Sequence, residues 1–192
     1  NGPALYAGGS FTNAIDSGDS FLAKWGNPSG CGSPGISVCE PSVGGVINCP
    51  CGNPPVGTGL GCDNSSSTGG AQLSATGIAR LTFDTVVFTT SGEKATATSI
   101  VLQGDRFSTS GLVFGQGVGC VAGNLKRMYV KTASGGSISA PRAMDLHVHS
   151  RSAALGDVIA PGTHRFYGVY YRDPTVLGSC PAGSTFNITQ QL

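Results

Sequence analysis

Alternation of apolar and polar residues, rather than a helical period, dominates this chain. β-Branched and aromatic residues gather in short segments separated by Gly or Pro, as is typical of strands joined by turns. Strands are predicted over six segments: 81–88, 95–102, 125–132, 144–148, 165–172 and 185–190. The best helical candidate, 152–159, is short and is interrupted by Gly156. The pattern therefore predicts an all-β fold, an antiparallel β-sandwich of jelly-roll type.

The first 30 residues form a region of their own, with two short predicted strands on either side of a polar turn at 16–19. Two isolated strands are at best marginally stable in water, so this extension needs cover from the sandwich, a neighbouring copy or other parts of a precursor. The expected domain organisation is an extension at 1–30, a Gly/Pro/Ser linker with cysteines at 31–48 and the sandwich at 49–192.

Composition and charge exclude several function classes. Charged residues make up 11% of the 192 positions, against about 25% in an average protein. The formal net charge of +1 leaves no electrostatic basis for binding nucleic acid. No apolar run approaches the roughly 18 residues of a membrane helix, so no membrane span is expected. A hydrophobic content of 39% is too high for a disordered chain.

Seven cysteines lie in sequence rich in Gly, Pro and Asn, which favours a disulfide framework and an oxidising compartment. Zinc would require paired C-x2-C spacings, and only Cys49-Pro50-Cys51 comes close. Two bridges are expected within one group of four cysteines, whose pairing the spacing does not reveal, and a third bridge between the remaining distant pair. The group of four is Cys39, Cys49, Cys51 and Cys62, and the distant pair is Cys120 and Cys180. Cys31 is then left as a free thiol or as a link to another molecule.

Two stretches carry a resemblance to known extracellular proteins. LYAGGSFTNA…FLAKW resembles one propeller-type repeat of large secreted bacterial repeat proteins. CPCGN, GCDNSSSTGGAQLSATG and RFYGVYYRDP are similar to a cysteine-bearing C-terminal β module of such proteins. The resemblance implies secretion, an all-β fold and a structural role at the cell surface or outside the cell. It implies no catalytic residue, and a single repeat cannot build a propeller.

The string Asp145-Leu146-His147-Val148-His149 carries the sharpest metal-binding pattern in the chain. On a strand, its carboxylate and both imidazoles point to one face. The string resembles the opening metal motif of the polymerase-and-histidinol-phosphatase family. That family's barrel cannot fit into the remaining residues, which hold one further histidine, His164. Two interpretations of His147 and His149 remain: a non-catalytic metal site, and an ordinary exposed strand face. The sequence favours the exposed strand face. No cofactor is expected.

No motif indicates an enzyme. The chain contains neither a G-x-S-x-G nucleophile elbow nor a glycine run that ends in Gly-Lys-Ser/Thr. Asn64 and Asn187 begin N-glycosylation sequons. Four aromatic residues lie within 166–171, with Tyr167 and Tyr171 on one face and Phe166 and Tyr170 on the other. A sugar-stacking strip is set against a place in the core, which the sequence favours for at least one of the two pairs.

These observations support two hypotheses about function. The first is a secreted structural protein whose copies assemble head-to-tail into a filament or surface layer. In it the N-terminal segment contacts the next subunit through six apolar side chains: Leu5, Tyr6, Phe11, Phe21, Leu22 and Trp25. The second is a carbohydrate-binding or adhesive module of a larger secreted protein, with surface polysaccharide as its partner.

Overall fold

The computed structural model describes residues 34–178, 180–181 and 183–192 in full, and the two short segments 5–8 and 22–25 by their backbone. It contains short strands, joined by turns, and one helix. The elements in chain order are β1 (Leu5–Gly8), β2 (Leu22–Trp25), β3 (Gln72–Thr76), β4 (Val87–Ser91), β5 (Thr98–Gly104), β6 (Arg106–Phe114), β7 (Gly117–Ala122), β8 (Lys126–Thr132), β9 (Ser139–Ala140), α1 (Val148–Ala154), β10 (Phe166–Arg172) and β11 (Phe186–Ile188).

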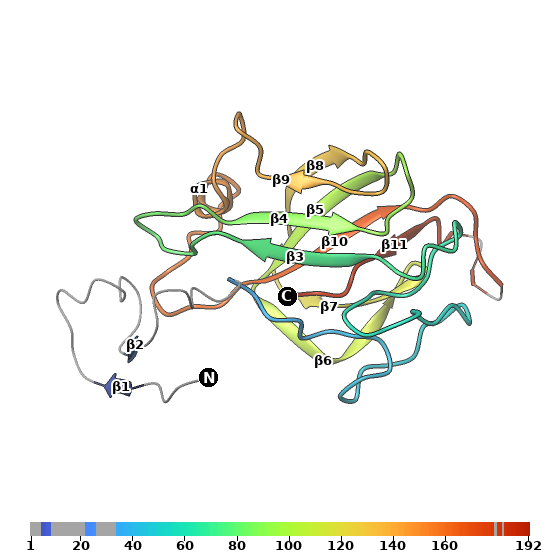
Figure 1. Ribbon diagram of the computed structural model, residues 1–192, viewed down its shortest axis with the longest axis horizontal. Coiled ribbons are helices and arrows are strands. Elements are labelled where there is room, and N and C mark those ends of the chain that lie inside the picture. Colours follow the sequence, from blue (N-terminus) through green and yellow to red (C-terminus); the bar gives the residue numbers. More distant parts are fainter. Residues whose placement is uncertain (1–4, 9–21, 26–33, 179, 182) are drawn as a thin grey trace.

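The strands form packed antiparallel sheets (Figure 1). One sheet has the order β11-β10-β5-β8, a second has the order β3-β4-β9, and β6 and β7 form a two-stranded sheet. β1 and β2 pair with each other in a two-stranded sheet that none of the other described strands joins. The prediction of an all-β, antiparallel, disulfide-stabilised fold is confirmed.

The main core lies between the β3-β4-β9 sheet and the β11-β10-β5-β8 sheet. In β3 and β4, buried and exposed positions alternate, so each strand places one face in this core. Across the core, the rings of Phe88 and Tyr167 stack with centroids 4.6 Å apart. The opposite face of β10 meets the β6–β7 hairpin, where the centroids of Phe107 and Phe166 are 5.3 Å apart. β10 is therefore covered on both faces.

The segment predicted to be a flexible linker packs onto the sandwich in its described part. Val38 donates a backbone hydrogen bond to Gln191 (2.9 Å), and Ile47 donates one to Ser110 (2.9 Å). Cys39 and Val46 are buried in a second, smaller core with Cys120. Composition suggested a linker because Gly, Pro and Ser dominate here, yet the backbone of 38–47 is held by distant partners.

Three disulfides connect the described cysteines. They are Cys39–Cys120, Cys49–Cys62 and Cys51–Cys180. The expected Cys120–Cys180 bridge was wrong, and one bridge rather than two lies within the group of four. Spacing along the chain could not reveal this pairing, because two of the bridges join residues that lie 81 and 129 positions apart. The three disulfides indicate an oxidising compartment.

The strand predicted at 144–148 was also wrong. The Asp145 carboxylate accepts hydrogen bonds from the backbone N–H of Arg142 (2.6 Å) and from the ammonium of Lys131 (2.9 and 2.6 Å), which holds a turn. α1 follows at Val148. The alternation of apolar and polar residues does not mark a strand face here, because Val148 is buried at the start of the helix while Met144 and Leu146 are exposed.

Candidate functional site

A groove of about 420 Å³ lies beside the β3–β4 turn, between that turn, α1 and the loop before β10. Its volume falls within the roughly 300–1,000 Å³ that is usual for ligand pockets. Most of its lining is apolar and includes Gly35, Ala79, Phe88, Val148, Ala160 and Leu192. We call this feature the apolar groove.

The polar side chains that line the apolar groove are already engaged or lie at its rim. Asp84 accepts hydrogen bonds from the backbone N–H groups of Val86 (3.0 Å) and His149 (2.7 Å). Arg165 makes two hydrogen bonds to the Asp157 carboxylate (2.6 and 2.8 Å). Those hydrogen bonds, against a smaller effect of burial, hold the pKa of Asp157 below its ordinary value. His164 is exposed.

The side chains of the apolar groove include few of the usual nucleophiles. Its described lining holds no serine, cysteine or lysine. The hydroxyl of Ser150 lies 3.4 Å from His149 Nδ1, beyond the reach expected of a nucleophile and its base, and it comes from the adjacent residue. Burial raises the pKa of Tyr167, so its phenol stays neutral and donates to Gln103 Oε1 (3.0 Å).

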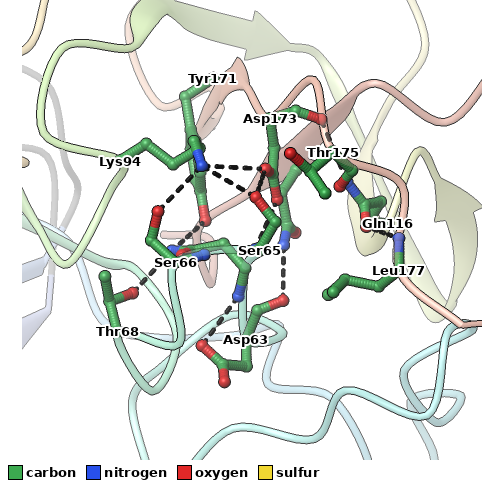
Figure 2. Close-up of polar contacts among 12 residues, drawn as sticks. Asp63, Ser65, Ser66, Thr68, Lys94, Gln116, Tyr171, Asp173, Thr175 and Leu177 are labelled. Atoms are coloured by element: carbon green, nitrogen blue, oxygen red, sulfur yellow. Dashed lines mark hydrogen bonds and ion pairs between the residues drawn. The ribbon is translucent and has the colours of Figure 1, made fainter.

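A second feature is a polar cluster around Asp173, shown in Figure 2. Asp173 is fully buried, and its carboxylate accepts hydrogen bonds from both the backbone N–H (2.9 Å) and the hydroxyl of Ser65. Lys94 Nζ donates to the hydroxyls of Ser65 and Ser66 (2.8 Å each) and lies 3.7 Å from Asp173 Oδ1. We call these four residues the loop clamp.

The side chains of the loop clamp are engaged with one another. The hydroxyl of Ser65 lies between Lys94 Nζ and the Asp173 carboxylate. Gln116 extends the cluster: its side-chain amide donates to the backbone oxygens of Asp173 (3.2 Å) and Thr175 (3.0 Å), and its oxygen accepts from Leu177 N–H (2.8 Å). Gln116 thereby ties the β6–β7 turn to the loop after β10, and the contact of Ser65 with Asp173 ties the loop before β3 to the same place (Figure 2).

Neither predicted glycosylation site is available in the folded protein. Asn64 is 1% exposed, and its Nδ2 donates to Thr68 Oγ1 (2.6 Å), Gly92 O (2.8 Å) and Tyr171 OH (3.2 Å). Asn187 is fully buried, and its Nδ2 donates to the backbone oxygens of Cys62 (3.2 Å) and Asp63 (2.8 Å). A glycan on either nitrogen would break these hydrogen bonds and could not be accommodated.

The expectation that at least one aromatic pair of β10 lies in the core is confirmed, and the alternative of a sugar-stacking strip is wrong. Tyr171 is fully buried, and Tyr167 packs against the same core. On the other face, the ring of Tyr170 makes edge contacts with Phe114 (5.7 Å) and Phe186 (6.2 Å). Both faces of β10 are covered by other elements, so alternation along the strand separates two buried faces rather than a core face and an exposed face.

The predicted metal candidates do not converge. His147 immediately precedes α1 and is exposed, whereas His149 lies within the helix and lines the apolar groove together with His164. Among the residues that the structure describes, no group of three His, Cys, Asp or Glu side chains could hold a metal ion.

The structure describes the predicted subunit contacts only in part. Leu5, Tyr6, Leu22 and Trp25 fall in β1 and β2, which are described by their backbone alone. Phe11, Phe21 and Cys31 lie outside the described residues.

Sequence reasoning missed both the apolar groove and the loop clamp. Their residues are spread over more than 100 positions, and no local motif marks them. The stretch 63–68 stood out as a polar loop and a sequon, but nothing in its sequence indicated Lys94 or Asp173 as partners.

No helix among the described residues has the length and apolar composition needed to cross a membrane. Comparisons of the chain with family models, curated proteins and solved structures found no match. The resemblance to secreted repeat proteins therefore stays a prediction.

Proposed function

We propose that this chain is an extracellular structural protein whose copies assemble head-to-tail through the N-terminal segment. One observation carries the proposal: β1 and β2 pair with each other in a sheet that no other described strand extends. A two-stranded sheet is marginally stable in water unless another surface covers it. If the cover comes from the next copy, the contact is heterologous and repeats along a filament or layer.

The framework of the sandwich supports this use. Three disulfides close long stretches of the chain, and buried amide side chains satisfy loop backbone that has no strand partner. Gln116, for example, accepts from Leu177 N–H (2.8 Å) and donates to Thr175 O (3.0 Å). Loops held in this way resist local opening, which suits a durable extracellular material.

Sedimentation velocity and electron microscopy of the full chain test the proposal. We expect concentration-dependent oligomers or filaments that are lost in the double variant Leu22→Ser with Trp25→Ser. Lys24→Ser, a polar-to-polar change on the same strand, is the matched control and should assemble normally. A wild-type chain that stays monodisperse and monomeric at all concentrations would contradict the proposal.

Cys31 has a place in the same proposal as an intermolecular link between assembled copies. Non-reducing electrophoresis of the assembled protein should then show a covalent dimer that disappears in Cys31→Ser. Assembly itself should persist in this variant, because the contact depends on the apolar segment.

A carbohydrate-binding module is the second candidate, and the apolar groove favours it in place of the aromatic strip. The aromatic pair Phe88 and Tyr167 and the rim imidazole of His164 line one cavity of suitable volume. Isothermal titration calorimetry of a monomeric chain with neutral oligosaccharides tests this candidate. Heat of binding that is lost when the exposed Ala160 is replaced by Arg would support it.

A further inference from the structure

We infer that the apolar groove is the surface that receives the β2 end of the N-terminal segment from a second copy of the chain. This inference deepens the proposed function and rests on it. The occupant is the stretch around Leu22–Trp25, which carries the single tryptophan of the chain.

The lining of the groove matches an apolar occupant. Phe88 and Val148, 2% and 4% exposed, belong to the main core and extend it to the groove. The small residues Ala79 and Ala160 also line the groove, at exposed positions. Three charged side chains line the groove. Asp84 and Arg165 are held by the hydrogen bonds given above, and Arg80 also has a partner, so an apolar occupant need not neutralise them.

The place where the chain leaves the groove supports the same occupant. Pro34 and Gly35, the first residues of the continuous described part, line the groove next to Leu192. The segment that precedes them is rich in apolar side chains and is attached at this cavity. Trp25 lies nine positions before Pro34, and nine extended residues span up to roughly 30 Å.

The segment of a neighbouring copy would bind the apolar groove through the same contact that the segment of the same chain could make. Residues 26–33 include Gly26, Pro28, Ser29 and Gly30, a composition that permits either path. Exchange of an identical element between copies is a low-cost route to assembly, because no new interface has to form. Repeated exchange in one direction produces the head-to-tail arrangement.

Blocking the groove in the full chain tests the inference. Ala79→Arg and Ala160→Arg each place a long cationic side chain at an exposed position in the lining. Ala154→Arg makes the same change at an exposed position of α1 outside the lining and is the matched control. Assembly is followed by sedimentation velocity, and burial of the indole by the emission wavelength of Trp25.

In the wild type, we expect the Trp25 emission to shift to shorter wavelength as the protein assembles. Both groove variants should lose assembly and keep the long-wavelength emission, while Ala154→Arg behaves as the wild type. Wild type that assembles, with groove variants that assemble equally well, would overturn this inference and leave the proposed function standing. Wild type that neither assembles nor buries Trp25 would overturn both.

Two further outcomes would assign the groove to another occupant. A monomeric wild type with a buried Trp25 that becomes exposed in Ala79→Arg would show docking within one chain and overturn delivery from a second copy. A monomeric wild type that binds a neutral oligosaccharide, with binding lost in Ala79→Arg, would assign the groove to sugar and overturn the inference.

Discussion

The Asp84 carboxylate accepts a hydrogen bond from the backbone N–H of His149, 65 positions further along the chain, at 2.7 Å. This N–H belongs to the first turn of α1, where N–H groups have no partner within the helix. The residue before the helix, His147, provides no side-chain cap. The start of α1 is therefore stabilised by a carboxylate from the β3–β4 connection, which also lines the apolar groove.

Asp84→Ala should lower the free energy of unfolding by about 1 kcal/mol, the usual effect of losing a helix cap. Asp84 also accepts from the Val86 N–H, so the loss should not be smaller than for a simple cap. Asp84→Asn keeps one acceptor oxygen and should lose less. Urea denaturation of the three proteins measures this order, and an alanine variant as stable as wild type would contradict it.

Glu93→Gln should change how stability depends on pH. Glu93 is 2% exposed; its Oε2 accepts from Ser99, and its Oε1 has no partner among the described residues. Burial, opposed by hydrogen bonds from Ser99 and Thr90, raises the pKa of this carboxyl above its ordinary value of 4.5. A raised pKa means that the folded state binds the proton more tightly than the unfolded state.

The stabilising contribution of Glu93 is therefore fully present below pH 4.5 and is lost as pH rises through the pKa of the folded state. Thermal unfolding across this range should show that Glu93→Gln is more stable than wild type at neutral pH. The difference should shrink in acid. Parallel pH profiles for the two proteins would show that Glu93 ionises in the folded state without cost.

Tyr171→Ala should lower the free energy of unfolding, because Tyr171 belongs to the core and not to a binding surface. Removal of a fully buried aromatic side chain costs about 3–5 kcal/mol. Tyr171→Phe removes only the hydroxyl that accepts from Asn64 Nδ2 (3.2 Å) and should cost about 1 kcal/mol. Arg172→Ala, at the exposed neighbour, serves as control and should change stability by less than about 0.5 kcal/mol. Guanidinium denaturation ranks the three variants.

The disulfides should differ in their contribution according to the length of chain that each closes. Cys39–Cys120 spans 81 positions and Cys49–Cys62 spans 13. The chain-entropy relation gives about 4.5 kcal/mol for the first and about 3 kcal/mol for the second. Paired alanine variants, compared by denaturation, should preserve this order. Peptide mapping under non-reducing conditions should recover the three pairs.

The local pattern of apolar and polar residues was sufficient to predict a strand where that strand has one buried face or a high apolar content. The predicted strands at 95–102, 125–132, 165–172 and 185–190 overlap β5, β8, β10 and β11. β6 and β7 were missed because their sequence is rich in Gly, Ser and Thr. Gly115 lies in the turn between them at φ +63°, where a Cβ would come within 2.3 Å of Phe186 O.

Composition and alternation along the chain were enough to establish a disulfide-bonded antiparallel β protein, because strand periodicity and cysteine content are properties of local sequence. Disulfide pairing, the start of α1, the apolar groove and the burial of Tyr171 and Asn64 depend instead on which distant segments become neighbours. That choice arises from the packing of whole sheets, in which residues such as Asp84 and His149 meet although nothing near either of them in the chain specifies the other.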